Sequence, residues 1–66
     1  MKNIGDELKT QRIISKKSLR QVEKDTGISI ASLSRWENGI VSPSIEFCIK
    51  LADYYGITLD ELVGRE

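Results

Sequence analysis

The chain has 66 residues with ten basic and ten acidic side chains, one cysteine and no histidine. We expect one domain over residues 1–66 with no disulfide, metal site, cofactor or catalytic activity, because no imidazole is available as a ligand or general base. No apolar run approaches the roughly 18 residues of a membrane span or the layout of a signal peptide, which predicts a cytoplasmic protein with no membrane partner. No small-molecule ligand is evident from the sequence.

Charge is distributed unevenly along the sequence. Five cations and two anions lie between Lys16 and Arg35, whereas two cations and five anions lie between Ser44 and Glu66. The first segment attracts phosphate and the second repels it, so a nucleic-acid contact is expected in the middle of the chain. The zero net charge is a weak argument against such a partner.

The first predicted element is a helix from about Asn3 to Ser15, with Asn3 as a candidate N-cap. Gly5 is expected to weaken this helix slightly. An apolar stripe recurs near helical spacing and consists of Ile4, Leu8 and Ile13 or Ile14. Strand-like alternation is missing from the sequence, which predicts an all-α fold.

Two short helices are predicted next. The pattern S-x-x-Q at Ser18–Gln21 has the form of a capping box, in which the hydroxyl and the amide bind backbone donors at a helix start. Gly27 can end that helix in the left-handed conformation, and Ser29 caps a second helix over residues 30–37. Asn38–Gly39 ends it as a turn. This arrangement matches a helix-turn-helix unit, whose second helix enters the major groove of DNA.

A loop over residues 40–43 precedes the fourth predicted helix, because Pro43 cannot sit inside a helix. Ser42 or Ser44 is expected to cap this helix, which extends to about Tyr55. Its buried face is predicted from three-four spacing and consists of Ile45, Cys48, Ile49, Ala52 and Tyr55.

Gly56 ends the fourth helix, and Thr58–Glu61 has a second capping-box pattern. A last helical turn with Leu62 and Val63 follows. The sequence therefore predicts a compact all-α bundle of five helices.

The segment SLRQVEKDTGISIASLSRWENGIVSPS, residues 18–44, resembles the Cro and phage-repressor type of helix-turn-helix domain, also called the xenobiotic-response-element family. The E-N-G turn and the proline after it are the most specific marks. The first helix and the closing LADYYGITLDELVG also resemble this family. The resemblance implies a lambda-repressor-like bundle with its helix-turn-helix unit at about 18–39. It also implies a sequence-specific transcriptional regulator of double-stranded DNA, namely a dimeric repressor that reads an inverted-repeat operator with its third helix in the major groove.

By motif position, the resemblance implies a set of base-reading candidates: Ile30, Ala31, Ser32, Ser34 and Arg35. Arg35 is the strongest, because its planar fork can donate two hydrogen bonds to guanine, worth about 1–3 kcal/mol of discrimination. The serines can bind base edges or phosphate, and Ile30 and Ala31 can contact a thymine methyl group. A solvated charge at Arg35 and a packing role for Ile30 are the open alternatives.

Phosphate contacts are expected from backbone amides at the start of the second helix and from the loop after the third. The side-chain candidates are Ser18, Arg20, Asn38 and Ser42. Leu19 stands where the family often has a phosphate-binding glutamine, so Arg20 or Ser18 is expected to replace that contact. A plain turn role explains Asn38 equally well.

Other residues have predicted structural roles. The resemblance implies an internal ion pair between Arg12 and Glu37. Glu23 stands where the family usually has a small residue, and its side chain is expected to extend outward. Cys48 is expected to be an inert buried thiol. The helices of the central unit are expected to pack through Val22, Ile28, Leu33 and Trp36.

A dimer surface is expected at the C-terminal end of the chain, formed by Leu59, Leu62, Val63 and Tyr54 or Tyr55. Core packing of the last helix is an equal alternative for these residues. The alternative function is an antitoxin-like protein-interaction module on the same fold, which binds a toxin or sigma factor. The near-zero net charge keeps this alternative open.

Overall fold

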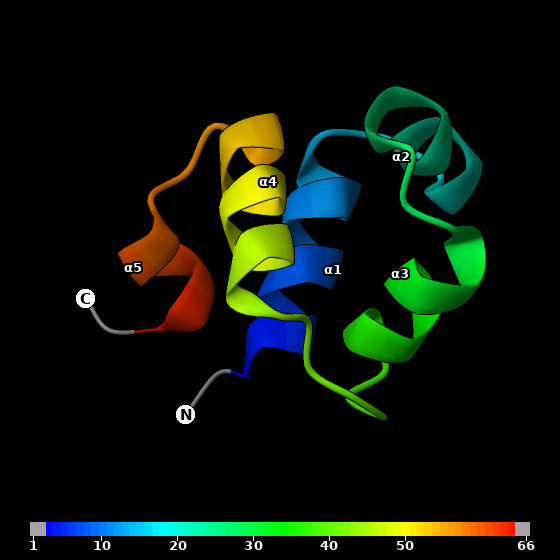
Figure 1. Cartoon of the computed structure of the whole chain (residues 1–66). Helices are drawn as coiled ribbons and strands as arrows, with labels where there is room; N and C mark the ends of the chain where they lie inside the picture. Colours follow the sequence, from blue (N-terminus) through cyan, green and yellow to red (C-terminus); the bar gives the residue numbers. More distant parts are fainter. Residues whose placement is uncertain (1–2, 65–66) are drawn as a thin grey trace.

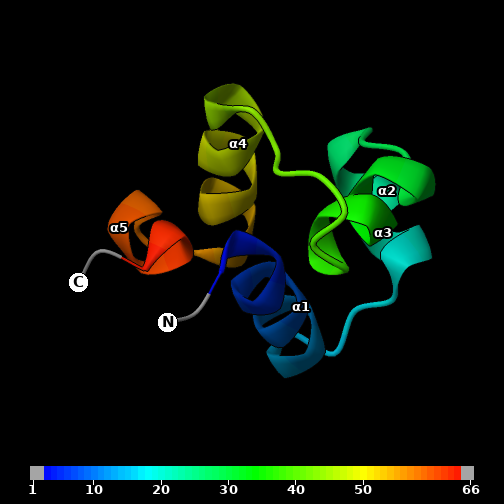
Figure 2. The ribbon, with the colours of Figure 1, turned by 90° about the horizontal axis from the view of Figure 1, so that it is seen from below.

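The computed structural model describes residues 3–64, and within them it contains five α-helices and no strand (Figure 1). The helices are α1 (Ile4–Ile14), α2 (Leu19–Thr26), α3 (Ile30–Glu37), α4 (Ile45–Tyr55) and α5 (Leu59–Val63). Both views place α2 and α3 at one end of the molecule and α5 at the other, with α1 and α4 between them (Figures 1 and 2). The predicted all-α bundle is confirmed. None of the helices in 3–64 has the length and apolar character that crossing a membrane requires.

The helix ends follow largely from capping chemistry. Backbone amides in the first turns donate to the side chains of four N-cap residues, Asn3, Ser18, Ser29 and Thr58. Gly27 and Gly56 adopt the left-handed conformation, with φ of 78° and 71°, and end α2 and α4. Ser44, not Ser42, is the N-cap of α4, and its side chain makes no capping hydrogen bond.

One predicted capping box is complete and the other is not. Thr58 and Glu61 bind each other's backbone amides at the start of α5. At the start of α2, the Ser18 hydroxyl accepts from the backbone amide of Gln21. The Gln21 side-chain amide, however, donates to the Asp25 carboxylate at 2.7 Å. The predicted return bond from Gln21 is therefore wrong. A carboxylate one turn further along α2 is a charged acceptor, and such hydrogen bonds are stronger than neutral ones.

The core is formed by side chains from all five helices and the turn between α2 and α3. Its buried apolar residues are Leu8, Val22, Ile28, Leu33, Trp36, Cys48, Leu51, Ala52 and Leu62. This confirms the burial predicted for the four packing residues of the central unit and for Cys48. Leu19 is partly buried and also packs against the core.

Two predicted apolar stripes are wrong in part. Ile13 and Ile14 are 58% and 66% exposed. They follow Leu8 by five and six residues, which places them on the far side of a helix with about 3.6 residues per turn. On α4, Ile45 and Ile49 are exposed and Leu51 is buried. Since α4 has apolar residues on more than one face, periodicity alone does not decide which face α1 and α5 cover.

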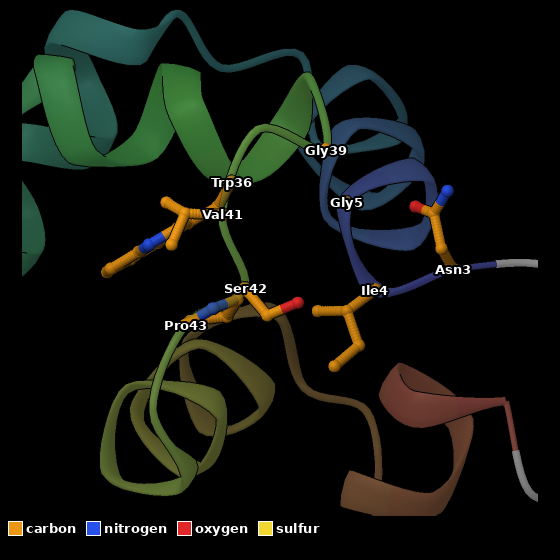
Figure 3. A pocket seen from close by; sticks show the side chains of 8 residues that line it. All are labelled: Asn3, Ile4, Gly5, Trp36, Gly39, Val41, Ser42 and Pro43. Carbon is orange, nitrogen blue, oxygen red and sulfur yellow. The ribbon is translucent and has the colours of Figure 1, made fainter.

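Gly5 allows α1 to approach the end of α3 closely. It is buried, and a Cβ atom there would collide with the carbonyl oxygen of Trp36 and lie 3.2 Å from that of Glu37. A small cavity of about 110 Å³ lies beside this contact, between the first turn of α1 and the segment 39–43 (Figure 3). Gly5 therefore has a packing role that its low helix propensity did not indicate.

Candidate nucleic-acid interface

α3 presents one face to the core and the opposite face to solvent. Leu33, Trp36 and Glu37 are buried. Ala31, Arg35 and Asn38 are exposed and follow one another by four and three residues, so they share one side of the helix. The turn between α2 and α3 is only three residues long, which places α2 directly beside this helix.

The predicted base-reading residues lie on or beside the exposed face of α3. Ala31 and Arg35 are exposed, whereas Ile30, Ser32 and Ser34 are partly buried. The hydroxyl of Ser32 is hydrogen-bonded to that of Ser29 at 3.1 Å, and the Asn38 amide donates to the Ser34 hydroxyl at 3.2 Å. The base-reading roles remain predictions.

The phosphate candidates lie at two neighbouring places. Ser18 and Arg20 are exposed at the start of α2, and Asn38 and Ser42 are exposed after α3. Figure 3 shows the Ser42 hydroxyl pointing toward Ile4 at the small cavity. These roles also remain predictions, and that orientation makes Ser42 the least direct candidate of the four.

The helix ends add an electrostatic contrast. The first turns of α1, α4 and α5 contain acidic residues, whereas those of α2 and α3 contain none. The N-terminus of a helix carries a partial positive charge from its unpaired amides. The α2 end is therefore free of its own anions and suited to bind a phosphate.

An ion pair anchors the C-terminal end of α3. Arg12 Nε lies 2.8 Å from Glu37 Oε2, and Arg12 Nη2 donates to Glu37 Oε1 at 3.0 Å. Arg12 Nη1 also donates to the Lys17 carbonyl oxygen at 3.0 Å. The hydrogen bond to Glu37 raises the pKa of Arg12. These contacts join α1, the end of α3 and the segment before α2.

A second polar cluster, formed by Lys17, Asp25 and Tyr54, joins α2 to α4. The Tyr54 hydroxyl donates to Asp25 at 2.5 Å, and Lys17 Nζ lies 3.6 Å from the same carboxylate. Lys17 Nζ also lies 5.2 Å from the centre of the Tyr54 ring. The hydrogen bond from Tyr54 lowers the pKa of Asp25. The sequence analysis did not predict this cluster, because no local pattern links residues 29 positions apart.

The orientation of the Glu23 side chain in the helix-turn-helix unit differs from the predicted one. Its side chain was expected to extend outward, but its carboxylate accepts a hydrogen bond from the Ile30 amide at 3.1 Å. It is partly buried and bridges α2 to the first residue of α3. The expected orientation is therefore wrong, because the unpaired amide at the start of α3 offers a closer partner than solvent does.

The predicted dimer residues differ in their exposure. Leu62 is only 1% exposed and belongs to the core, so its predicted place on a dimer surface is wrong. Tyr54, Leu59 and Val63 are partly buried, and their interface role remains a prediction. A group of exposed apolar side chains near the start of α4 was not predicted from the sequence, and it consists of Ile40, Val41, Ile45, Phe47 and Ile49.

Within residues 3–64, no cluster of three or more potential ligand side chains is placed to hold a metal ion. Cys48 is buried, and this burial raises the pKa of its thiol. A buried thiol with a raised pKa is a poor nucleophile, because the thiolate is the reactive form.

Comparison with known proteins identifies a family and a curated relative. The model of the Helix-turn-helix family matches residues 8–62. A curated relative, the cryptic phage CTXphi transcriptional repressor RstR of Vibrio cholerae serotype O1, is 37% identical over 62 residues, which cover 94% of this chain. The match covers 55% of the relative, so the chain spans about half of that protein's length.

Proposed function

The chain belongs to the Cro/C1-type helix-turn-helix family, and from this we propose that it binds specific sequences of double-stranded DNA and represses transcription. One observation carries the proposal: α3 buries one face and leaves Ala31, Arg35 and Asn38 exposed on the other. A major groove about 12 Å wide admits such a helix. The similarity to a phage transcriptional repressor supports the repressor role.

In the proposed complex, α3 lies in the major groove and its exposed face contacts the bases. Arg35 donates to guanine, and Ala31 contacts a thymine methyl group. Ser18 and Arg20 at the start of α2 bind the phosphates on one side of α3, and Asn38 and Ser42 bind those after it. The role requires no chemical step or cofactor, and we place it in the cytoplasm.

We further propose that two copies bind an inverted repeat. Recognition helices of such dimers lie about 34 Å apart, so each α3 lies about 17 Å from the two-fold axis. The largest extent of the molecule is 29 Å, and α5 lies at the opposite end from α3 (Figure 1). A two-fold axis beside Leu59 and Val63 of α5 is compatible with this spacing.

Selection of bound duplexes from a random pool tests DNA binding, half-site sequence and symmetry together. The expected result is enrichment of one inverted repeat, with binding that weakens steeply as salt is added, because phosphate contacts release counterions. Recovery of unselected sequences only, or no recovery above background, would overturn the proposal.

A protein-interaction module is the second candidate function. The observation that favours it is the group of five exposed apolar side chains at residues 40–49. In that case the chain binds a protein partner with little salt dependence and does not enrich a duplex. Charge reversal at Arg35 would then leave partner binding unchanged, whereas Ile45→Asp would weaken it.

A further inference from the structure

The side chain of Glu23 connects the two helices of the helix-turn-helix unit. Its Oε2 atom accepts the Ile30 amide at 3.1 Å, seven residues further along the chain. Both residues are partly buried, so water competes less for this bond than it does at an exposed site. The acceptor is a charged carboxylate, and charge-assisted hydrogen bonds are roughly twice as strong as neutral ones.

The bond satisfies a donor at the start of α3 that lacks a partner within that helix. The first amides of a helix have no acceptor one turn back. Ser29 binds the Ser32 amide through its hydroxyl and the Leu33 amide through its carbonyl oxygen. The first turn of α3 contains no acidic residue of its own. Glu23 supplies from α2 the anion that this helix end lacks.

Thr26 makes two hydrogen bonds at the other side of the same turn. The buried Thr26 hydroxyl donates to the Val22 carbonyl oxygen at 2.7 Å and accepts from the Ile28 amide at 3.2 Å. The bond from the Ile28 amide to Thr26 fixes the chain as it leaves α2. The bond from the Ile30 amide to Glu23 fixes it as it enters α3. Of the two, only the Glu23 bond reaches a residue of α3 itself.

We propose that Glu23 is a positioning residue that sets the direction of α3 relative to α2, and through it the base selectivity of the domain. The inference rests on the proposed function. Ile30, whose amide donates the bond, and Ala31, which follows it, are base-reading candidates at the end of α3 held by Glu23. The other end is held by the ion pair of Arg12 and Glu37. Loss of the Glu23 bond frees the N-terminal end of α3 to shift in the groove, while phosphate contacts elsewhere remain.

The test compares three substitutions at Glu23. Glu23→Gln keeps an oxygen acceptor at the same reach and removes the charge. Glu23→Asp keeps the charge and shortens the reach, and Glu23→Ala removes both. Glu46→Gln and Glu46→Ala are matched controls, because Glu46 is an exposed acidic residue on α4. The measured quantity is the ratio of dissociation constants for a scrambled duplex and for the duplex selected by the parent chain, at one salt concentration and below the unfolding transition of each variant.

The expected result is a ratio that falls at least about fivefold in Glu23→Ala and Glu23→Asp, which is the discrimination carried by about one base contact. Glu23→Gln keeps a neutral and weaker acceptor, so it loses less of the ratio than Glu23→Ala does. Both Glu46 variants keep the ratio within about twofold. A loss of fold alone lowers binding to both duplexes equally and leaves this ratio unchanged.

The inference is overturned if Glu23→Asp keeps the parent's ratio and Glu23→Ala, where it folds, keeps it too. It is also overturned if Glu23→Gln loses the ratio as fully as Glu23→Ala does, because the retained oxygen acceptor then makes no difference to the position of α3. A parent chain that does not discriminate between the duplexes disproves the proposed function, and the inference with it. Discrimination by the parent and by all variants disproves the inference alone.

Discussion

Arg35 is exposed in the last turn of α3. Replacement by alanine removes its charged fork without touching the core, so the fold should remain intact. We expect Arg35→Ala to lose about 1–3 kcal/mol of preference at one base pair of each half-site. Binding of the variant to a series of single-base-pair operator changes measures this loss.

Arg20→Ala is the control, since Arg20 is exposed at the start of α2 and is expected to contact phosphate. It should weaken binding to all operator variants by a similar factor and lower the salt dependence. Arg35 would have no readout role if its alanine variant ranked the operator variants as the parent does.

Ionisation of the partly buried Tyr55 phenol on α4 is a second property that can be tested, through its dependence on pH. Partial burial, assisted by the nearby charge of Glu37, raises the pKa of Tyr55 from 10 to about 12. Because the pKa is raised on folding, the neutral phenol stabilises the folded state fully below pH 10, and this contribution is lost as the pH rises toward 12.

The titration can be observed directly in Tyr54→Phe, since the chain has two tyrosines and this variant retains only Tyr55. The ultraviolet absorbance of the phenolate should rise with a midpoint near 12. A midpoint at the ordinary value of 10 would show that Tyr55 is not enclosed as described.

At the scale of elements, the contact between α1 and the end of α3 depends on the absence of a side chain at Gly5. In an ordinary helix, replacing glycine by alanine stabilises by about 0.5–1 kcal/mol. Here the added methyl group collides with the Trp36 backbone, and overpacking of this kind costs about 1–3 kcal/mol. We therefore expect Gly5→Ala to destabilise the domain.

Thermal or denaturant unfolding of Gly5→Ala measures the effect. Thr10→Ala is a suitable comparison, because Thr10 is an exposed residue of the same helix and alanine there should be neutral or stabilising. An increase in stability for Gly5→Ala would contradict the close approach of α1 to α3.

Local chemistry explains why the elements could be predicted from sequence and some of their faces could not. The N-cap at Ser29 and the left-handed Gly27 act within a few residues, so both ends of the turn were predictable. The buried face of α4 depends on which neighbours cover it, and Leu51 was missed for that reason. The bonds of Glu23 to Ile30 and of Tyr54 to Asp25 exist only once the helices are arranged in space.

At the scale of the whole molecule, the two ends of the domain differ in charge. The cation-rich segment forms α2 and α3 at one end, and the acidic first turn of α5 lies at the other (Figure 1). In the proposed complex, such a charge distribution would orient the molecule before contact, since DNA attracts the first end and repels the second. The sequence predicted this asymmetry, because the charges are segregated along the chain as well as in space.

The central claim is that the exposed face of α3 enters a DNA groove. Mapping of backbone amide shifts by nuclear magnetic resonance, as the selected duplex is added, tests this claim most directly. The largest changes are expected at residues 30–38 and at the start of α2. Largest changes along residues 40–49, with α3 unaffected, would contradict it.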